Sequence, residues 1–344
     1  MEPHRQRERL ACLIVAHNLG DAVIQSMFLE QLVARGYARG YLVWTRPQVA
    51  FLFEKIPQCE VICSQFPVGT AKQMAGSAIF TFLKAVLRVR SRRPSVTIDL
   101  IGDLRDRLFA RIAGTPRHLF IGWAESHPFK RLIRNPFGVG APFVTVPADI
   151  RNVYAAYDIM LQKLIPVSNP TLLGHGIRLR RTSADRPLRV GLQPFASQAC
   201  KLWPDENWRQ LAQSLLARGA EVVAFGAPTD VGALHAIFGH FGEGVRLVTG
   251  SIPNFANQVS ALDVMVGLDS FSVHMAQLQG VRSVMINAGN PPDLWAPPMG
   301  NTMANSGGCA FYPCYNVPKC EGSEKEYACV RAVTPAQVLQ AVQN

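Results

Sequence analysis

Short runs of apolar and β-branched residues alternate along the chain with longer stretches in which apolar residues recur at helical spacing. The runs predicted to be strands span residues 10–17, 40–44, 60–63, 95–100, 118–123, 188–193, 221–225, 245–249, 263–267 and 283–287. The stretches predicted to be helices span residues 22–35, 77–93, 204–217, 229–238, 254–261, 270–279 and 335–343. This alternation is typical of parallel sheets whose strands are joined by crossover helices, so we expect an α/β protein.

A stretch rich in proline and glycine interrupts the alternation near the middle of the chain. It suggests a linker at residues 171–187, with one short strand at 177–180, between an N-terminal domain of residues 1–170 and a C-terminal domain of residues 188–344. A chain of 344 residues is long enough for two such cores. Ligands of doubly wound sheets bind at the loops that leave the strands, so the informative residues should follow strands.

Positive charge is concentrated in the first half. Residues 1–187 hold 26 of the 35 basic and 13 of the 24 acidic side chains, whereas residues 188–344 are close to neutral. This asymmetry suggests that the first half faces an anion: a nucleic acid, a membrane surface or an acidic saccharide. Nucleic acid is the weakest choice because the basic residues form no recognised binding module.

No segment predicts membrane insertion. The charged start and the apolar run after it resemble a signal peptide, but the run is short and lacks a small-residue cleavage site. No stretch reaches the roughly 20 apolar residues of a spanning helix. We expect a cytoplasmic protein whose basic half allows peripheral contact with the cytoplasmic face of the inner membrane.

The eight cysteines fall into two groups. Four lie among apolar neighbours and are expected to be inert: Cys12, Cys59, Cys63 and Cys200. The other four cluster near the C-terminus: Cys309, Cys314, Cys320 and Cys329. Such a cluster in a cytosolic protein is more often a metal site than a disulfide pair, but its spacing matches no standard zinc motif. A bound metal, packed thiols and an adventitious disulfide all remain open, and no metal or other cofactor is predicted.

The first strand runs into a turn that contains Gly20 and Asp21. Gly20 permits a tight turn, and Asp21 falls at the start of the next helix. An Asp there is most often the N-cap, and a carboxylate at the lip of a cleft can alternatively act as a general base. The turn lacks the dinucleotide fingerprint, and the chain has no P-loop motif.

Two loops of the second half carry candidate phosphate ligands. Ser197 and Lys201 follow its first strand, where a lysine can neutralise a phosphate or simply be solvated. Asp269 and Ser270 follow its fourth strand, and one of them should cap the next helix, whose N-terminal N–H groups can bind a diphosphate. His274 lies one turn further and is either part of that site or a buried, hydrogen-bonded core histidine.

These motifs together resemble glycosyltransferase family 9, the ADP-heptose:lipopolysaccharide heptosyltransferases and their relatives. The resemblance extends along nearly the whole chain and rests on Gly20-Asp21, residues 99–105, residues 201–204 with Trp208, Phe225-Gly226, and Asp269-Ser270 with His274. It implies a GT-B architecture, in which two Rossmann-like doubly wound domains face a central cleft. The N-terminal domain would bind the acceptor and the C-terminal domain the nucleotide sugar.

The resemblance also implies roles for single residues. Asp21 would be the general base that deprotonates the acceptor hydroxyl. Lys201 would contact the donor diphosphate, and Ser270 with the backbone after it would cradle that group. Asp269 would hold the sugar, and His274 would support the loop.

Further contacts complete the implied site. Gly20 and Ser197 would contact the substrates, and Thr229 or Asp230 would contact the ribose of the nucleotide. The implied reaction is inverting transfer of heptose from ADP-heptose to a lipopolysaccharide core or a related anionic envelope glycan.

Two departures from the family pattern lie in the donor half. Phe271 stands where the family usually has glycine, and Phe195 ends a segment where the family commonly has His-Pro-Gly. They motivate two alternatives: a transferase for another nucleotide sugar, or a non-catalytic protein that binds an anionic glycan or membrane surface. A nucleotide-sugar epimerase with the same fold is a further alternative. The cysteine-rich tail resembles that of some relatives that bind iron, but this spacing carries no metal prediction.

Overall fold

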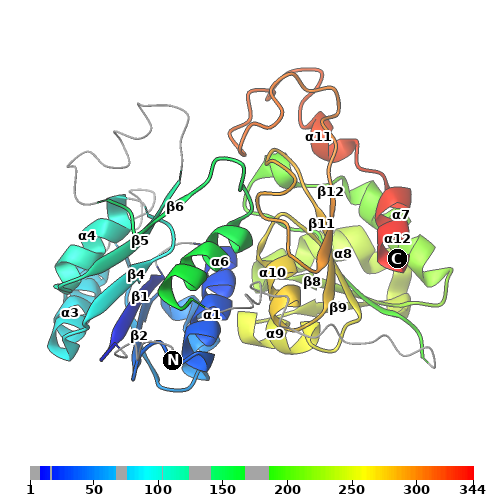
Figure 1. Ribbon diagram of the computed structural model, residues 1–344. Coiled ribbons are helices and arrows are strands. Elements are labelled where there is room, and N and C mark those ends of the chain that lie inside the picture. Colours follow the sequence, from blue (N-terminus) through cyan, green and yellow to red (C-terminus); the bar gives the residue numbers. More distant parts are fainter. Residues whose placement is uncertain (1–7, 16–17, 67–75, 103, 124–140, 167–185) are drawn as a thin grey trace. The chain divides into compact units, whose positions relative to one another are not determined.

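The computed structural model describes residues 8–15, 18–66, 76–102, 104–123, 141–166 and 186–344. The chain forms two compact units (Figure 1). Unit 1 comprises Met1–Arg151 and Ala155–Leu173, and unit 2 comprises Asn152–Tyr154 and Gly174–Asn344. The predicted strand at 177–180 and all but the last two residues of the predicted linker lie outside the described residues.

Unit 1 contains a six-stranded parallel sheet in the order β3-β2-β1-β4-β5-β6. The strands are β1 Ala11–Val15, β2 Tyr41–Thr45, β3 Cys59–Cys63, β4 Val96–Asp99, β5 His118–Trp123 and β6 Val144–Val146. The helices are α1 Leu19–Ala34, η1 Pro47–Val49, α2 Phe51–Glu54, α3 Gly76–Arg92, α4 Leu104–Ala113 and α6 Val153–Leu164, whose first two residues belong to unit 2.

Unit 2 repeats the plan in the order β12-β11-β10-β7-β8-β9. Its strands are β7 Arg189–Gln193, β8 Glu221–Gly226, β9 Val245–Thr249, β10 Val264–Leu268, β11 Arg282–Ile286 and β12 Gly300–Met303. Its helices are η3 Ala199–Lys201, α7 Asp205–Leu216, η4 Pro228–Asp230, α8 Val231–Phe238, η5 Gly239–Gly244, α9 Ile252–Val259, α10 Phe271–Leu278, α11 Ala328–Arg331 and α12 Pro335–Gln343.

Both sheets place their strands in the same succession, with the third strand at one edge and the sixth at the other. The chain therefore reverses direction across each sheet between its first and fourth strands, which are β1 and β4 in unit 1 and β7 and β10 in unit 2. This is the strand order of the dinucleotide-binding Rossmann fold. Ligands of such sheets bind outside the carboxyl ends of the strands at the reversal, so each unit has one expected site.

Aromatic side chains build the core of each unit. In unit 1 the ring centroid of Trp44 lies 5.3 Å from that of Phe82 on α3 and 5.8 Å from that of Phe109 on α4. In unit 2 the rings of Trp203 and Trp208 meet edge to face at 5.0 Å, and the indole N–H of Trp203 donates to the carbonyl of Val333 at 2.8 Å. Both tryptophans therefore belong to the buried core of unit 2.

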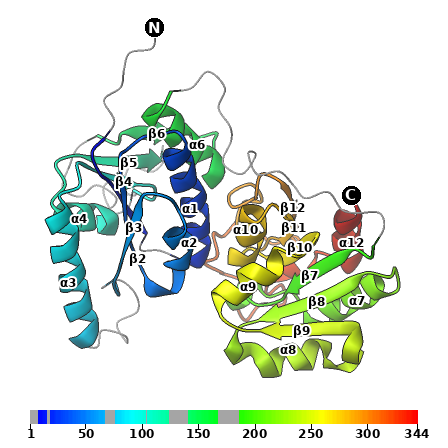
Figure 2. The same cartoon turned by 90° about the horizontal axis from the view of Figure 1, so that it is seen from below.

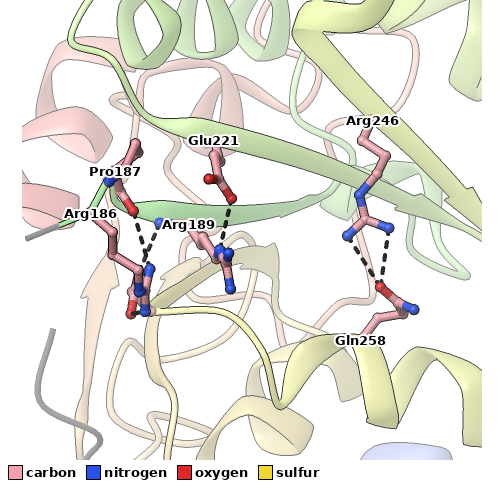
Figure 3. Close-up of polar contacts among 7 residues, drawn as sticks. Arg186, Pro187, Arg189, Glu221, Arg246 and Gln258 are labelled. Atoms are coloured by element: carbon pink, nitrogen blue, oxygen red, sulfur yellow. Dashed lines mark hydrogen bonds and ion pairs between the residues drawn. The ribbon is translucent and has the colours of Figure 1, made fainter. Parts of the chain in front are cut away.

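The amino ends of the strands in unit 2 are held by polar pairs (Figure 3). Arg186 donates to both carboxylate oxygens of Asp263 at 2.7 Å, and the backbone N–H of Arg189 donates to the same carboxylate at 2.8 Å. Burial alone would raise the pKa of Asp263, but these donors lower it. The side chain of Arg189 pairs with Glu221 across β7 and β8 at 2.7 Å. The pairs fix the strand ends opposite the expected ligand site.

Among the helices of the described segments, none is both long enough and apolar enough to cross a bilayer.

Candidate functional site

Lys201 and Asp269 meet at the carboxyl ends of β7 and β10, although 68 residues separate them. The Lys201 ammonium donates to the backbone carbonyl of Asp269 at 3.0 Å and to its carboxylate Oδ2 at 3.1 Å. The side-chain amide of Asn290, which follows β11, donates to the same Oδ2 at 2.6 Å. The Lys201 side chain is 15% exposed and that of Asp269 is 4% exposed. A lysine and a carboxylate are thus fixed at the reversal of the second sheet.

Ser270 occupies the N-cap position of α10, which confirms the prediction that one of two residues would do so. Its side chain makes no capping hydrogen bond within the described residues. The hydroxyl instead donates to the side-chain oxygen of Gln193 at 3.4 Å and lies 3.2 Å from that of Ser272. Because the hydroxyl is directed towards β7, the first-turn N–H groups of α10 and the positive end of its dipole are available to an anion.

His274 lies in the second turn of α10 and is 3% exposed. Its Nδ1 is 2.8 Å from the hydroxyl of Tyr154, at the start of α6. Burial lowers the pKa of His274 to about 4; Asp269 opposes this shift and Lys201 adds to it. The imidazole is therefore neutral at physiological pH and acts as a hydrogen-bonding group rather than as a cation. This geometry matches the interpretation of His274 as a buried, hydrogen-bonded histidine.

The two phenylalanines that depart from the family pattern pack against unit 2 itself. The ring centroid of Phe271 lies 5.0 Å from that of Phe255 on α9. The Phe255 centroid in turn lies 5.2 Å from that of Phe225 at the end of β8. A side chain at Gly226 would come within 3.1 Å of Phe195. Phe271 and Phe195 are half-buried, and they line the carboxyl ends of β7, β8 and β10 with aromatic surface.

The remaining predicted ligands of unit 2 follow β7 and β8. Ser197 and Thr229 are exposed. The Asp230 carboxylate accepts the backbone N–H of Ala227 at 2.9 Å and the Thr229 hydroxyl at 3.4 Å, so it stabilises its own turn. The structure places Thr229 and Asp230 at the second strand, where Rossmann folds carry an acidic residue for the ribose.

The first sheet carries Gly20 and Asp21 at its reversal. Helix α1 begins at Leu19 with Asn18 as its N-cap, so Gly20 is a helical residue and the interpretation of Asp21 as the N-cap is wrong. The Asp21 carboxylate accepts the backbone N–H of Asn18 at 3.1 Å from the first helical turn. A carboxylate in this turn also complements the helix dipole. Asp21 is 9% exposed.

Residues 99–102 form a structural turn at the end of β4, the neighbour of β1. The Asp99 carboxylate accepts the backbone N–H groups of Ile101 at 3.0 Å and Gly102 at 2.7 Å. Gly102 has a φ of +72°, and a side chain there would approach the carbonyl of Ile121 to 1.9 Å. The glycine is therefore required by the close approach of this turn to β5. Asp103, within the same motif, lies outside the described residues.

The pKa of buried Tyr157 on α6 reflects the charges around this end of the sheet. Burial raises its pKa well above the usual value, and the negative charges of Asp21, Asp99 and Asp106 raise it further. The surroundings of Asp21 are thus acidic as well as partly desolvated.

Five cysteines line one small cavity of unit 2, beside the loop between β12 and α11: Cys200, Cys309, Cys314, Cys320 and Cys329. All five are free thiols. Burial and the neighbouring thiols raise the pKa of Cys200 and of Cys329, which favours their protonated forms. Within the described residues, no three His, Cys, Asp or Glu side chains are arranged to hold a metal ion. No step of the chemistry is assigned to these thiols.

Three residues of the donor-side network carry no sequence signal of their own. Gln193 accepts from two serine hydroxyls, Asn290 donates to Asp269, and Tyr154 binds His274. Gln193 is the last residue of β7 and Asn290 follows β11, but no local pattern marks either amide as part of the site. Tyr154 lies 120 residues before its partner.

Comparisons with known proteins agree with this geometry. The model of glycosyltransferase family 9 (heptosyltransferase) matches residues 169–324. A glycosyl transferase family 9 structure from Veillonella parvula is 18% identical, with a TM-score of 0.73 over 98% of this chain and 97% of that one. E. coli heptosyltransferase WaaC with ADP is 14% identical, with a TM-score of 0.70 over 97% and 99% of the two chains. E. coli ADP-heptose lps heptosyltransferase II is 18% identical, with a TM-score of 0.64 over 97% of each. Comparison with the curated proteins gives no match.

Two six-stranded parallel Rossmann-like sheets, which match these structures along the chain, give the protein the fold of GT-B-type glycosyltransferases. The family match over residues 169–324 then confirms the resemblance to glycosyltransferase family 9 that the motifs predict.

Proposed function

We propose that the protein is an inverting heptosyltransferase that moves heptose from ADP-heptose to a lipopolysaccharide core or a related anionic envelope glycan. The observation that carries this proposal is the pairing of Lys201 with Asp269 beside the N-terminus of α10. A fixed cation and a helix end at the reversal of a Rossmann sheet suit a nucleoside diphosphate. The similar WaaC structure contains ADP, which supports an adenine nucleotide as the leaving group.

In the proposed donor site, each polar group has one task. The Lys201 ammonium has three N–H donors and gives two of them to Asp269, so the third can bind a phosphate oxygen. Ser270 and the first N–H groups of α10 cradle the diphosphate. Asp269 holds a sugar hydroxyl, and Ser197, Thr229 and Asp230 contact the nucleotide.

The neutral His274 keeps the donor loop in place through Tyr154. As the glycosidic bond to the diphosphate breaks, negative charge grows on the leaving group. Lys201 and the helix end stabilise that charge without reorganising.

In the proposed acceptor site, Asp21 takes the proton of the acceptor hydroxyl while this oxygen attacks the anomeric carbon from the face opposite the leaving group. General-base catalysis of this kind contributes about 10²–10⁴-fold to the rate. The 26 basic residues of the first half fit an acceptor that carries carboxylates or phosphates. We place the reaction in the cytoplasm, at the inner face of the membrane where such an acceptor is anchored.

Substitution of Asp21 by asparagine tests the proposal. The Asp21→Asn variant should retain donor binding, because the carboxylate belongs to the other unit, and should lose transfer by about 10²–10⁴-fold. Asp149→Asn, at an exposed position of the same unit, is the matched control and should transfer normally. Turnover by Asp21→Asn at the rate of the unaltered protein would exclude Asp21 as the base.

A transferase for another nucleotide sugar is the second candidate, and Phe271 is the observation that favours it. Phe271 opens α10, where the family usually has glycine, and its ring rests on Phe255. An aromatic wall at this position can accept a different base or sugar. A panel of nucleotide sugars separates the two candidates by the donor that binds most tightly.

A further inference from the structure

Helix α3 of unit 1 buries only one of its faces. The side chains of Phe82, Ala85, Val86 and Val89 lie at helical spacing and belong to the core cluster that contains Trp44. They are 8% exposed or less. This stripe packs the helix against the sheet, and the exposed apolar side chains of α3 from residue 79 onward lie outside this core cluster.

A second apolar stripe of α3 faces solvent. Ile79, Phe80, Leu83 and Leu87 are 44%, 70%, 54% and 69% exposed. Residues 79, 83 and 87 are four apart and therefore form one row along the helix, with Phe80 at its flank. Helix α4 lies beside α3 (Figures 1 and 2). Its Leu108 is 54% exposed. Half of the ten exposed large apolar side chains of the described residues belong to these two helices.

A row of cations runs beside the exposed apolar stripe. Lys84, Arg88 and Arg92 are again four residues apart, on the side of α3 away from the core. The helix contains no acidic residue. Glu60 on β3 pairs with Arg88 at 3.1 Å and with Arg92 at 2.8 Å, but the two guanidinium side chains stay 56% and 48% exposed. One carboxylate among three cations leaves the row positively charged.

We propose that α3, with Leu108 of α4, docks unit 1 on the surface of an anionic lipid bilayer. The helix lies parallel to the membrane plane, with Phe80, Leu83 and Leu87 at the boundary between headgroups and acyl chains and Lys84 among the lipid phosphates. A helix with an apolar face next to a basic face binds membranes in this way. This inference rests on the proposed function only for its purpose, which is to bring the acceptor-binding unit to a membrane-anchored acceptor.

The charge pattern distinguishes a bilayer from a second copy of the chain. Two copies that paired through this stripe would set one cationic row against the other, and like charges at an interface disfavour association. An anionic bilayer can bind the apolar stripe through its acyl chains and the row of cations through its headgroups at the same time.

Vesicle flotation of the full chain tests the proposal. The protein should float with vesicles of phosphatidylethanolamine and phosphatidylglycerol and should remain unbound with vesicles of phosphatidylcholine alone. The double variant Phe80→Ser/Leu87→Ser should bind at least about ten-fold more weakly, because two apolar side chains no longer enter the interface. Val317→Ser, which removes an apolar side chain that is 68% exposed in unit 2, is the matched control and should bind normally.

A charge variant provides an independent result at a position that has no part in the core. Lys84→Gln should weaken binding to the anionic vesicles about five-fold, as expected for the loss of one cation near a charged membrane. Lys55→Gln, at an exposed position elsewhere in unit 1, should leave binding unchanged.

Three results would overturn the proposal. These are equal binding to both vesicle types, full binding by both the double variant and Lys84→Gln, and a dimer in analytical ultracentrifugation that Phe80→Ser/Leu87→Ser dissolves. The vesicles contain neither donor nor acceptor, so membrane binding is measured without transfer. Transfer to a soluble, lipid-free acceptor fragment is in turn measured without the membrane, so failure of either idea can be recognised by itself.

Discussion

The buried imidazole of His274 predicts a specific loss of stability in acid. Burial lowers its pKa to about 4 in the folded protein, whereas the unfolded chain has a value near 6.5. Between pH 6.5 and about 4, His274 is protonated in the unfolded state but neutral in the folded state. The free energy of unfolding therefore falls as the pH falls through this window. At pH 4.5 the loss attributable to His274 is about 2.5 kcal/mol.

Urea unfolding followed at several pH values, together with NMR titration of the imidazole, measures this loss. The variant His274→Gln keeps a polar partner for Tyr154 but cannot titrate, and all other acidic and basic groups are shared with the unaltered protein. The difference in unfolding free energy between the two proteins should therefore shift by about 2.5 kcal/mol from pH 7 to pH 4.5. An imidazole pKa at or above 6 in the folded protein, or parallel pH curves for both proteins, would refute the assignment of His274 as a buried neutral group.

Two further predictions concern the supports of the sites. Asp263→Asn should lower stability at neutral pH by about 1–2 kcal/mol, because it removes the charged acceptor of Arg186. Since the folded pKa of Asp263 lies below its unfolded value, this difference should begin to shrink below about pH 4 and should disappear once the pH falls below the folded pKa. The control is Glu221, whose exposed carboxylate pairs with Arg189. Glu221→Gln should lower the free energy of unfolding, measured with denaturant, by less than about 1 kcal/mol. Gly102→Ala should lower the melting temperature more than Gly219→Ala, since both glycines have positive φ but only the first would place Cβ 1.9 Å from a carbonyl; equal losses would show that the close approach to Ile121 is unimportant.

The order of strands and helices could be predicted well, because the apolar runs of a parallel sheet are buried on both faces and stand out in the sequence. All ten predicted strands are present within a residue or two of their expected ends. Two strands were missed for a physical reason. β6 has only three residues, and β12, with the sequence Gly-Asn-Thr-Met, is an edge strand with little apolar content.

The candidate site was predictable where it follows from topology. Lys201 and Asp269 each follow a strand, and the order of the sheet makes those strands neighbours. The interpretation of Asp21 as a cap was wrong because Asn18, three residues earlier, can cap equally well and lets α1 begin at Leu19. Asn290 could not be singled out, since an amide that binds a carboxylate across two loops leaves no local pattern.

Donor binding tests the central claim most directly. Isothermal titration of the folded protein with a panel of nucleotide sugars should show ADP-heptose as the tightest ligand. Lys201→Gln should weaken that binding at least about ten-fold, the effect of losing one charge-assisted contact to a phosphate, while Lys325→Gln, at an exposed position of the same unit, should bind as the unaltered protein does. Failure of every nucleotide sugar to bind, or full affinity in Lys201→Gln, would contradict a donor site at the carboxyl ends of β7 and β10.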